Sequence, residues 1–155
     1  MDARTKRFIM EIVDTQTDLT LATLRDDGYP QANTLGYAND GLTIYFGTDR
    51  GSQKVKNLLH CNKVSLTIVA PYAHWGDIKA LSMGGTAEVL PDDSSESRKA
   101  MDLITRRFPT VLGMSPPVDP SAMVFVRIRA KVISVLDYRK GFGHAELVQV
   151  EPVTH

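Results

Sequence analysis

Apolar and polar residues alternate along much of this chain, which is the pattern of strands with one buried face. Segment 29–38 is bracketed by two hairpin turn signals, Asp-Asp-Gly at 26–28 and Asn-Asp-Gly at 39–41. The other segments with this pattern, rich in Val, Ile, Leu and Thr, are 18–25, 42–48, 63–70, 78–90 and 122–137. We therefore expect about six strands, of which the first three form an antiparallel meander.

Three other segments have the 3.6-residue periodicity of helices. Apolar residues fall on one face in residues 4–14 and again in residues 52–59. A third helix is expected to begin at a capping box formed by Asp93 and Glu96 and to end near Phe108. Because these helices are short and do not alternate regularly with strands, the pattern predicts a mainly β protein, an antiparallel barrel of Greek-key type.

Two smaller features refine this picture of the barrel. Gly84 and Gly85 interrupt segment 78–90, so we expect the strand to bend there. Four prolines within 109–120 indicate a loop before the last strand.

Composition excludes several functional classes. Eighteen basic residues balance eighteen acidic ones, so no global positive field is available to hold nucleic acid or an anionic membrane. With 155 residues and 43% hydrophobic content, residues 1–155 are expected to form a single domain. The lone cysteine, Cys61, a charged N-terminal segment and the lack of a long apolar run favour the cytoplasm.

The segment Gly-Ser-Gln-Lys at 51–54 presents an electrostatic problem. Ser52 stands where the cap of the helix over 52–59 should be, yet Arg50, Lys54 and Lys56 surround the first turn. Cations are disfavoured beside the positive end of a helix dipole. A bound anion such as a phosphate would reverse this effect, whereas solvated surface lysines are the simpler alternative.

The order of these motifs resembles the flavin-binding split β-barrel family of pyridoxamine 5′-phosphate oxidase. The motifs that carry the resemblance are Gly-Tyr-Pro-Gln-Ala-Asn-Thr-Leu-Gly-Tyr (28–37), Leu-Thr-Ile-Tyr-Phe-Gly-Thr (42–48), Gly-Ser-Gln-Lys-Val-Lys-Asn-Leu-Leu (51–59), Lys-Val-Ser-Leu-Thr-Ile-Val (63–69) and Gly-Gly-Thr-Ala-Glu-Val-Leu (84–90). The resemblance covers about 15–137 and leaves a tail at 138–155. It implies an FMN-binding split barrel that forms a homodimer, with the cofactor at the subunit interface.

The resemblance also implies which residues bind FMN. Ser52, Gln53 and Lys54 match the segment that holds the phosphate, together with the neighbouring Arg50. Thr48 and Phe46 are expected near the ribityl phosphate. The backbone that would line the isoalloxazine ring belongs to Asn33, Thr34 and Leu35.

Residues outside this core are weaker candidates for the cofactor site. In the family, the segment after the last strand reaches the flavin of the partner subunit, which implicates Tyr138, Phe142 and His144. Trp75 is expected to stack on a ring, to close the barrel mouth or to lie at a subunit interface. The four histidines have no zinc-binding spacing, so no metal is expected.

Departures from the oxidase restrict the function that can be expected. Ala32 and Tyr37 replace a characteristic Arg and Lys, and residues 106–120 do not match the segment that binds pyridoxal phosphate. We therefore expect an FMN-dependent oxidoreductase that acts on an unidentified small molecule, with no catalytic residue assigned. The alternatives are a deazaflavin-dependent reductase and a flavin or haem carrier without turnover.

Overall fold

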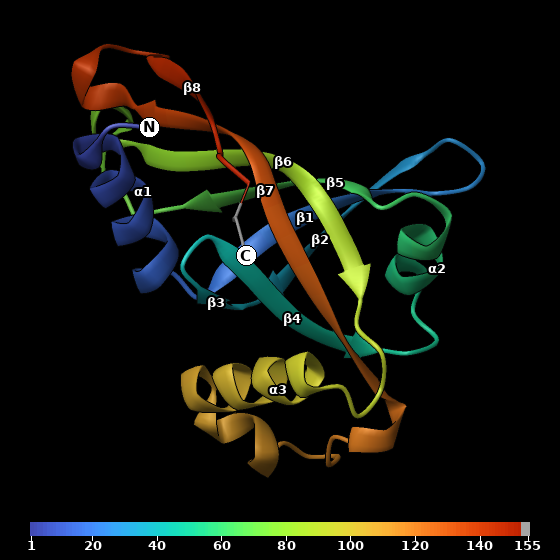
Figure 1. Ribbon diagram of the computed structural model, residues 1–155. Coiled ribbons are helices and arrows are strands. Elements are labelled where there is room, and N and C mark those ends of the chain that lie inside the picture. Colours follow the sequence, from blue (N-terminus) through green and yellow to red (C-terminus); the bar gives the residue numbers. More distant parts are fainter. Residues whose placement is uncertain (153–155) are drawn as a thin grey trace.

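The longest strand organises the sheet in the computed structural model, which describes residues 1–152 apart from the side chain of Leu112. Along one edge, β7 (Met123–Asp137) pairs with β6 (Lys79–Val89). Along its other edge it pairs first with β4 (Thr43–Asp49) and then with β8 (Ala145–Gln149). This strand therefore holds together both halves of the curled sheet in Figure 1.

The remaining strands complete an eight-stranded antiparallel sheet with the order β2-β1-β5-β6-β7-β4-β3, in which β8 branches off at β7. Their bounds are β1 (Asp18–Leu24), β2 (Pro30–Gly36), β3 (Ala38–Asp40) and β5 (Lys63–Val69). Both ends of this order belong to one stretch of chain, because only Tyr37 separates β2 from β3. The sheet thus closes on itself, and the expected mainly β, antiparallel barrel is confirmed.

A bulge gives β6 and β7 the curvature that this closure needs. The register of the two strands shifts between Gly84 and Gly85, which face Val132 and Ala130. A Cβ atom on Gly85 would lie 2.3 Å from the carbonyl oxygen of Arg129. Only glycine allows the backbones to approach so closely, and the bend expected at these two glycines is confirmed.

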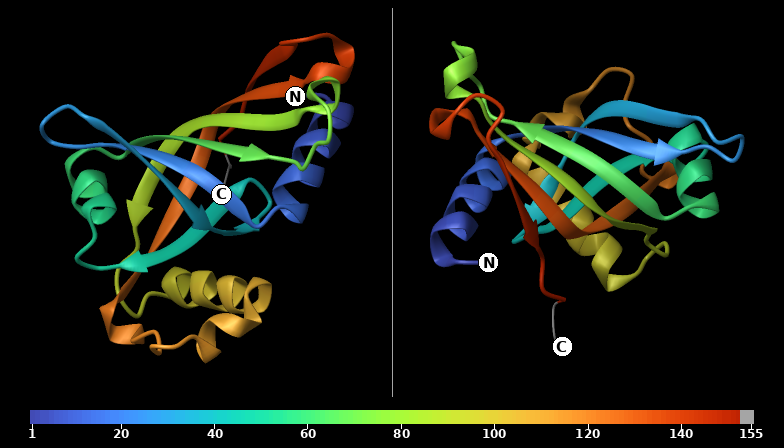
Figure 2. Two further views of the ribbon diagram at one scale, coloured as in Figure 1. Left: turned by 180° about the vertical axis from the view of Figure 1, so that it is seen from behind. Right: turned by 90° about the horizontal axis from the view of Figure 1, so that it is seen from above.

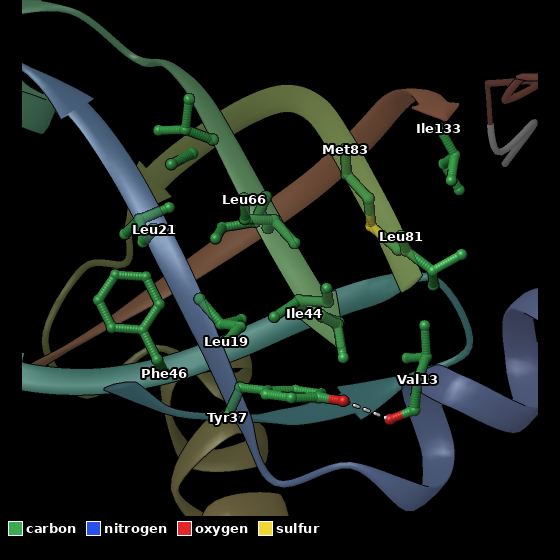
Figure 3. Packing of buried hydrophobic residues seen from close by; sticks show 14 of the residues in the cluster. Val13, Leu19, Leu21, Tyr37, Ile44, Phe46, Leu66, Leu81, Met83 and Ile133 are labelled. Carbon is green, nitrogen blue, oxygen red and sulfur yellow. Dashed lines mark hydrogen bonds between the residues drawn. The ribbon is translucent and has the colours of Figure 1, made fainter. Parts of the chain in front are cut away.

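The barrel interior is filled by apolar side chains from every long strand (Figure 3). Tyr37 closes this core at the corner between β2 and β3, where its side chain is fully buried. Its hydroxyl donates a hydrogen bond of 2.7 Å to the carbonyl oxygen of Val13. Burial raises the pKa of Tyr37 to about 12, so this hydrogen bond persists at all physiological pH values.

Three α-helices of the described chain surround the sheet, and α1 and α2 lie at opposite ends of it (Figure 2). Helix α1 (Ala3–Thr15) contributes Ile9, Ile12 and Val13 to the core. Helix α2 (Gln53–His60) contributes Leu58. Neither these two helices nor α3 is long and apolar enough to cross a membrane.

Helix α3 (Ser95–Arg107) packs outside the barrel against β4 and β7. Glu96 accepts hydrogen bonds from Arg127 on β7 and, at 3.0 Å, from the hydroxyl of Tyr45 on β4. Further along the helix, Lys99 pairs with Asp40 at 2.6 Å. Polar contacts therefore attach the helix to the sheet beside a small apolar cluster.

Two expectations about strands need correction. Segment 29–38 is not one strand, because it bends at Tyr37 so that β2 pairs with β1 and β3 pairs with β4. The tail is also more regular than expected. After Gly141 and Gly143, both at positive φ, the chain forms β8 on the edge of β7.

The expected capping box of α3 is wrong by one residue. Ser94 is the N-cap, and its hydroxyl accepts a hydrogen bond of 3.1 Å from the amide of Ser97. Asp93 instead has a φ of 57° in the preceding turn. Glu96 turns away from the cap because Arg127 and Tyr45 bind its carboxylate.

The bulge predicts unequal effects of two neighbouring substitutions. Gly85→Ala should destabilise the fold by about 1–3 kcal/mol or more, because the new Cβ meets backbone atoms that cannot move aside. Gly84→Ala is the matched control, since its Cβ would meet a side-chain methyl of Val132 at 3.1 Å. Urea unfolding of the two variants tests this order, and equal stability would contradict the role of Gly85.

The attachment of α3 predicts a dependence of stability on pH. The hydrogen bond from Arg127 lowers the pKa of Glu96. A carboxyl with a lowered folded-state pKa stabilises the fold above its ordinary pKa of 4.5 and loses that effect as pH falls further. Glu96→Gln should therefore lower the free energy of unfolding at pH 7 by about 1 kcal/mol and should flatten the acid limb of the stability profile.

Glu88 on β6, the second carboxylate that pairs with Arg127, provides the control for the Glu96→Gln experiment. Glu88 also pairs with Arg127, but its side chain is 59% exposed. Glu88→Gln should change the stability at pH 7 by less than Glu96→Gln, because exposed pairs contribute little. Chemical unfolding between pH 3 and pH 7 compares the two variants, and a steeper acid limb in Glu96→Gln would refute this assignment.

Candidate functional site

The first turn of α2 has the features of an anion site. Strand β4 leads into this turn, where the hydroxyl of Ser52 accepts a hydrogen bond of 3.4 Å from the amide of Val55. The Thr48 hydroxyl lies 3.4 Å from that of Ser52. The amides of Gln53 and Lys54 have no acceptor within residues 1–152. Two hydroxyls and two amides are thus gathered at the positive end of the helix.

The cations near this turn differ in what they contact. Lys54 is half-buried, and within residues 1–152 no carboxylate oxygen lies within 4.0 Å of its Nζ atom. Arg50 instead forms a 3.0 Å ion pair with Asp92 and donates to the carbonyl oxygen of Met123 at 3.4 Å. Arg50 therefore fastens the loop before α2 to the start of β7, whereas Lys54 is available to an anion.

A polar network fixes α2 against the sheet. Asn57 is only 1% exposed, and its amide nitrogen donates to Thr23 and to Gln31, each at 2.9 Å. Its amide oxygen accepts a hydrogen bond of 2.8 Å from the side chain of Gln53. The side chain of Gln53 is thus engaged, and its backbone amide is the group left for an anion. In the sequence, nothing indicated the role of Asn57 beyond its place directly before the apolar pair Leu58-Leu59.

Strand β2 passes beside this network and carries the residues expected to line a flavin ring. Alternation places Asn33 and Leu35 half-buried, whereas Thr34 is exposed on the outer face. The Thr34 hydroxyl lies 3.3 Å from that of Thr20 on β1. The backbone of this strand is thus accessible from its outer face.

Phe46 does not present its side chain to any ligand. It is 0% exposed and packs in the barrel core, as Figure 3 shows. Of Phe46, only the backbone is therefore left to approach a ribityl phosphate. The physical reason is the alternation along β4, which turns Ile44, Phe46 and Thr48 to the inside.

An apolar pocket of about 340 Å³ lies on the outer side of β4, beneath α3. Two glycines contribute to its lining, Gly36 at the end of β2 and Gly47 in the middle of β4. The first directly follows Leu35, and the second directly precedes Thr48. The pocket therefore adjoins both strands expected to hold the cofactor. In the sequence, its only visible signs were two glycines inside strand patterns.

The four remaining candidates gather at the opposite end of the molecule. Trp75 and Phe142 stack with ring centroids 6.0 Å apart, and Tyr138 meets Phe142 edge-on at 5.4 Å. His144 lies 3.0 Å from Glu146 on β8. Figures 1 and 2 place β8 and α2 at opposite ends of the sheet, so within one subunit these residues do not join the anion site.

This end of the molecule has its own ion pair. Asp137, at the end of β7, is 5% exposed and accepts two hydrogen bonds from the Arg139 guanidinium, at 2.8 and 2.9 Å. The guanidinium lowers the pKa of this carboxyl. Arg139 also lies over the ring of Phe8, with 6.0 Å between the guanidinium carbon and the ring centroid. These contacts tie the tail to α1 and position the aromatic cluster.

No metal site is apparent among residues 1–152, where no group of three or more His, Cys, Asp or Glu side chains could hold an ion. Cys61 is half-buried at the C-cap of α2.

Solved structures with the same fold have diverse descriptions. A haem binding protein from Mycobacterium smegmatis aligns with a TM-score of 0.80 at 20% identity, over 96% of this chain and 59% of that protein. The haem storage protein HutZ from Vibrio cholerae aligns with a TM-score of 0.67 at 16% identity, over 79% of this chain and 87% of that one. An F420 reductase aligns with a TM-score of 0.65 at 25% identity, over 81% and 94%.

Comparison of the sequence with known proteins identifies the family of this chain. The chain spans less than two thirds of the M. smegmatis haem binding protein. No curated protein matches the sequence significantly. A family model described as pyridoxamine 5′-phosphate oxidase matches residues 5–136, which include every strand except β8 and the end of β7. The curled antiparallel barrel and this match together show that the chain belongs to the pyridoxamine 5′-phosphate oxidase family of split barrels.

Proposed function

We propose that this protein binds FMN and acts as a flavin-dependent oxidoreductase on a small molecule. The observation that carries the proposal is the first turn of α2, which follows β4. There, two amides and Lys54 have no partner within residues 1–152, and two hydroxyls lie beside them. Family membership makes a flavin the first choice for an anion at this position.

The chemistry of the donor set fits a phosphate. A phosphate carries close to two negative charges and accepts several hydrogen bonds, which the helix amides and the hydroxyl of Ser52 can donate. The buried hydroxyl of Thr48, 3.4 Å from that of Ser52, would orient the Ser52 hydroxyl. Lys54 would neutralise part of the charge. The buried network around Asn57 would keep these donors in place before the cofactor binds, because it joins α2 to β1 and β2.

Within this proposal the chain positions the cofactor and shields it. FMN would supply hydride transfer at its ring. The backbone of Asn33 to Leu35 on β2 would support the ring, since the side chains on the outer face of this strand are small. The phosphate site would set the distance between the flavin ring and the apolar pocket. That pocket would exclude water from one side of the ring.

Two alternative cofactors have different support. A deazaflavin with an anionic tail would use the same donors, and the structural similarity to an F420 reductase at 25% identity favours this choice. Haem is named in the descriptions of two structural neighbours. No histidine lines the apolar pocket among residues 1–152, which gives haem iron no imidazole ligand there.

We also propose a homodimer that works in the cytoplasm as a single domain. The middle of the outer face of β1, β2 and β5 carries small uncharged residues in register across the three strands: Thr20, Ala22, Ala32, Thr34, Ser65 and Thr67. Trp75 and Phe142 are 66% and 78% exposed, which favours burial against another surface. A second copy seated on this face would bring its tail, including Tyr138 and His144, toward the flavin.

Substitution of one lysine tests the phosphate site. Lys54→Ala should weaken FMN binding by roughly tenfold to a hundredfold, because it removes a charge-assisted hydrogen bond of about 1.5–3 kcal/mol. Riboflavin binding should hardly change, since riboflavin lacks the phosphate. Fluorescence titration of both flavins gives the two dissociation constants.

Lys56→Ala is the matched control, because Lys56 is exposed two residues further along the same helix. It should leave the affinity for FMN within about twofold of the original. The melting temperature of each unliganded variant should stay the same or rise slightly, since a cation is removed from the start of a helix. An unchanged FMN dissociation constant in Lys54→Ala would refute the phosphate site.

Light scattering tests the assembly. With FMN bound, the protein should have twice the chain mass of 17.1 kDa, because a half-covered flavin needs a partner subunit. Thr34→Arg places a charge at the centre of the proposed interface and should shift the mass toward the monomer, while the outward-pointing side chain leaves the core intact. A monomer that retains tightly bound FMN would contradict this proposal.

A further inference from the structure

The pocket beneath α3 has a lining unlike any other depression described on this molecule. Its volume of about 340 Å³ falls within the range of roughly 300–1,000 Å³ that is usual for small-molecule sites. The pocket lies between the sheet, the C-terminal half of α3 and the chain that follows it. Its described lining includes Gly36, Gly47, Met101, Ile104, Thr105, Phe108, Thr110, Val111, Met114, Val118, Pro120, Met123 and Phe125.

None of these lining residues is titratable. The hydroxyl of Thr105 is already engaged, because it donates a hydrogen bond of 2.7 Å to the carbonyl oxygen of Met101. A charged ligand would lose its hydration here and find no ion to pair with. The two other described depressions differ in this respect, since one is lined by Arg127 and Arg129 and the other by Arg4 and Arg139.

The pocket is suited to a flat ring. Phe108 and Phe125 offer aromatic edges and faces, and three methionines can adapt to the outline of a ligand and contact its ring through sulfur. Met101 and Met114, at the rim, remain 47% and 56% exposed. A ligand that covered these two side chains would remove apolar surface from water, which favours binding.

The floor of the pocket connects it to the proposed cofactor site. A Cβ atom on Gly36 would lie 3.1 Å from the ring of Phe108, and one on Gly47 would lie 3.1 Å from Phe125. The lack of side chains at these glycines therefore lets the rings of Phe108 and Phe125 pack directly on the backbone of β2 and β4, which brings the pocket lining against these strands. Those strands carry the residues expected to support the flavin ring.

We infer that this pocket binds a small, uncharged aromatic molecule as the substrate of the proposed flavin chemistry. The inference rests on the proposed function, because a ring supported by β2 would lie beside the pocket. The absence of ionisable residues in its described lining disfavours phosphorylated substrates such as pyridoxamine 5′-phosphate. Substrate selection would then depend on the lost hydration of charged competitors rather than on a specific hydrogen bond.

A pair of dyes with the same ring framework tests the pocket in the FMN-loaded protein. N-phenyl-1-naphthylamine is neutral, and 1-anilinonaphthalene-8-sulfonate adds one negative charge. The neutral dye should bind at one site per chain and at least roughly tenfold more tightly than the sulfonate. Equal affinities, or tighter binding of the sulfonate, would overturn the inference.

Two rim substitutions locate the dye. Met101→Lys and Met114→Lys each place a charge at the pocket mouth without disturbing the core, because both side chains are about half exposed. Each should weaken binding of the neutral dye by roughly tenfold or more. Leu147→Lys is the control, since Leu147 is 71% exposed on β8 at the far end of the sheet and should leave dye binding unchanged. Melting temperatures confirm that each variant is folded.

Two further measurements separate this inference from the proposed function. FMN affinity should be the same in Met101→Lys as in the original protein, because the phosphate site is untouched. Tight FMN binding without dye binding would refute the pocket alone, and dye binding without FMN binding would refute the flavin proposal alone. Displacement of the dye by FMN, or conversion of a dimer to a monomer by Met101→Lys, would show that the pocket belongs to the cofactor ring or to a subunit interface.

Discussion

The close approach of β6 to β7 at Gly85 is the constraint on which the rest of the structure depends. If β6 and β7 were flat, β7 could not pair with both β4 and β8, because these two strands run in different directions. The bulge turns β6 and β7 so that β4 pairs with the first half of β7 and β8 with the second half. Both the barrel wall and the docking site for α3 follow from this curvature.

Closure at Tyr37 converts the curved sheet into two distinct environments. Inside, the alternating residues of all the long strands form an apolar core, which includes Phe46. Outside, the same alternation exposes small residues on β2 and places Gly47 of β4 on the outer surface. Helix α3 covers only part of that outer surface, because Glu96 and Lys99 attach it to the sheet in specific positions. The apolar pocket lies between this helix, the chain that follows it and the sheet.

Strand β4 joins two regions of opposite chemistry, because Thr48 lies beside Ser52 and Gly47 lines the apolar pocket. At one end, the first turn of α2 gathers amides, hydroxyls and the ammonium group of Lys54, which suit an anion. At the other end, the pocket beneath α3 has no ionisable residue in its described lining and suits an uncharged ring. A molecule with a phosphate at one end and a flat ring at the other matches the first region directly and would bring its ring beside the second. This arrangement is the physical basis of the proposed flavin chemistry.

The sequence by itself determined the kind of fold and the position of the candidate anion site. Strand alternation, the two Asn/Asp-Gly turns and the glycine pair at 84–85 are local patterns, and each predicted an element or a bend that the structure contains. Ser52 and Lys54 were likewise visible, because capping and charge at a helix start involve residues close in sequence. What only the tertiary structure decided depends on contacts between distant segments. Three features depend on residues tens of positions apart: the ion pair of Arg50 with Asp92, the burial of Asn57 against Thr23 and Gln31, and the pocket between Gly47 and α3. No local periodicity encodes which of these residues meet.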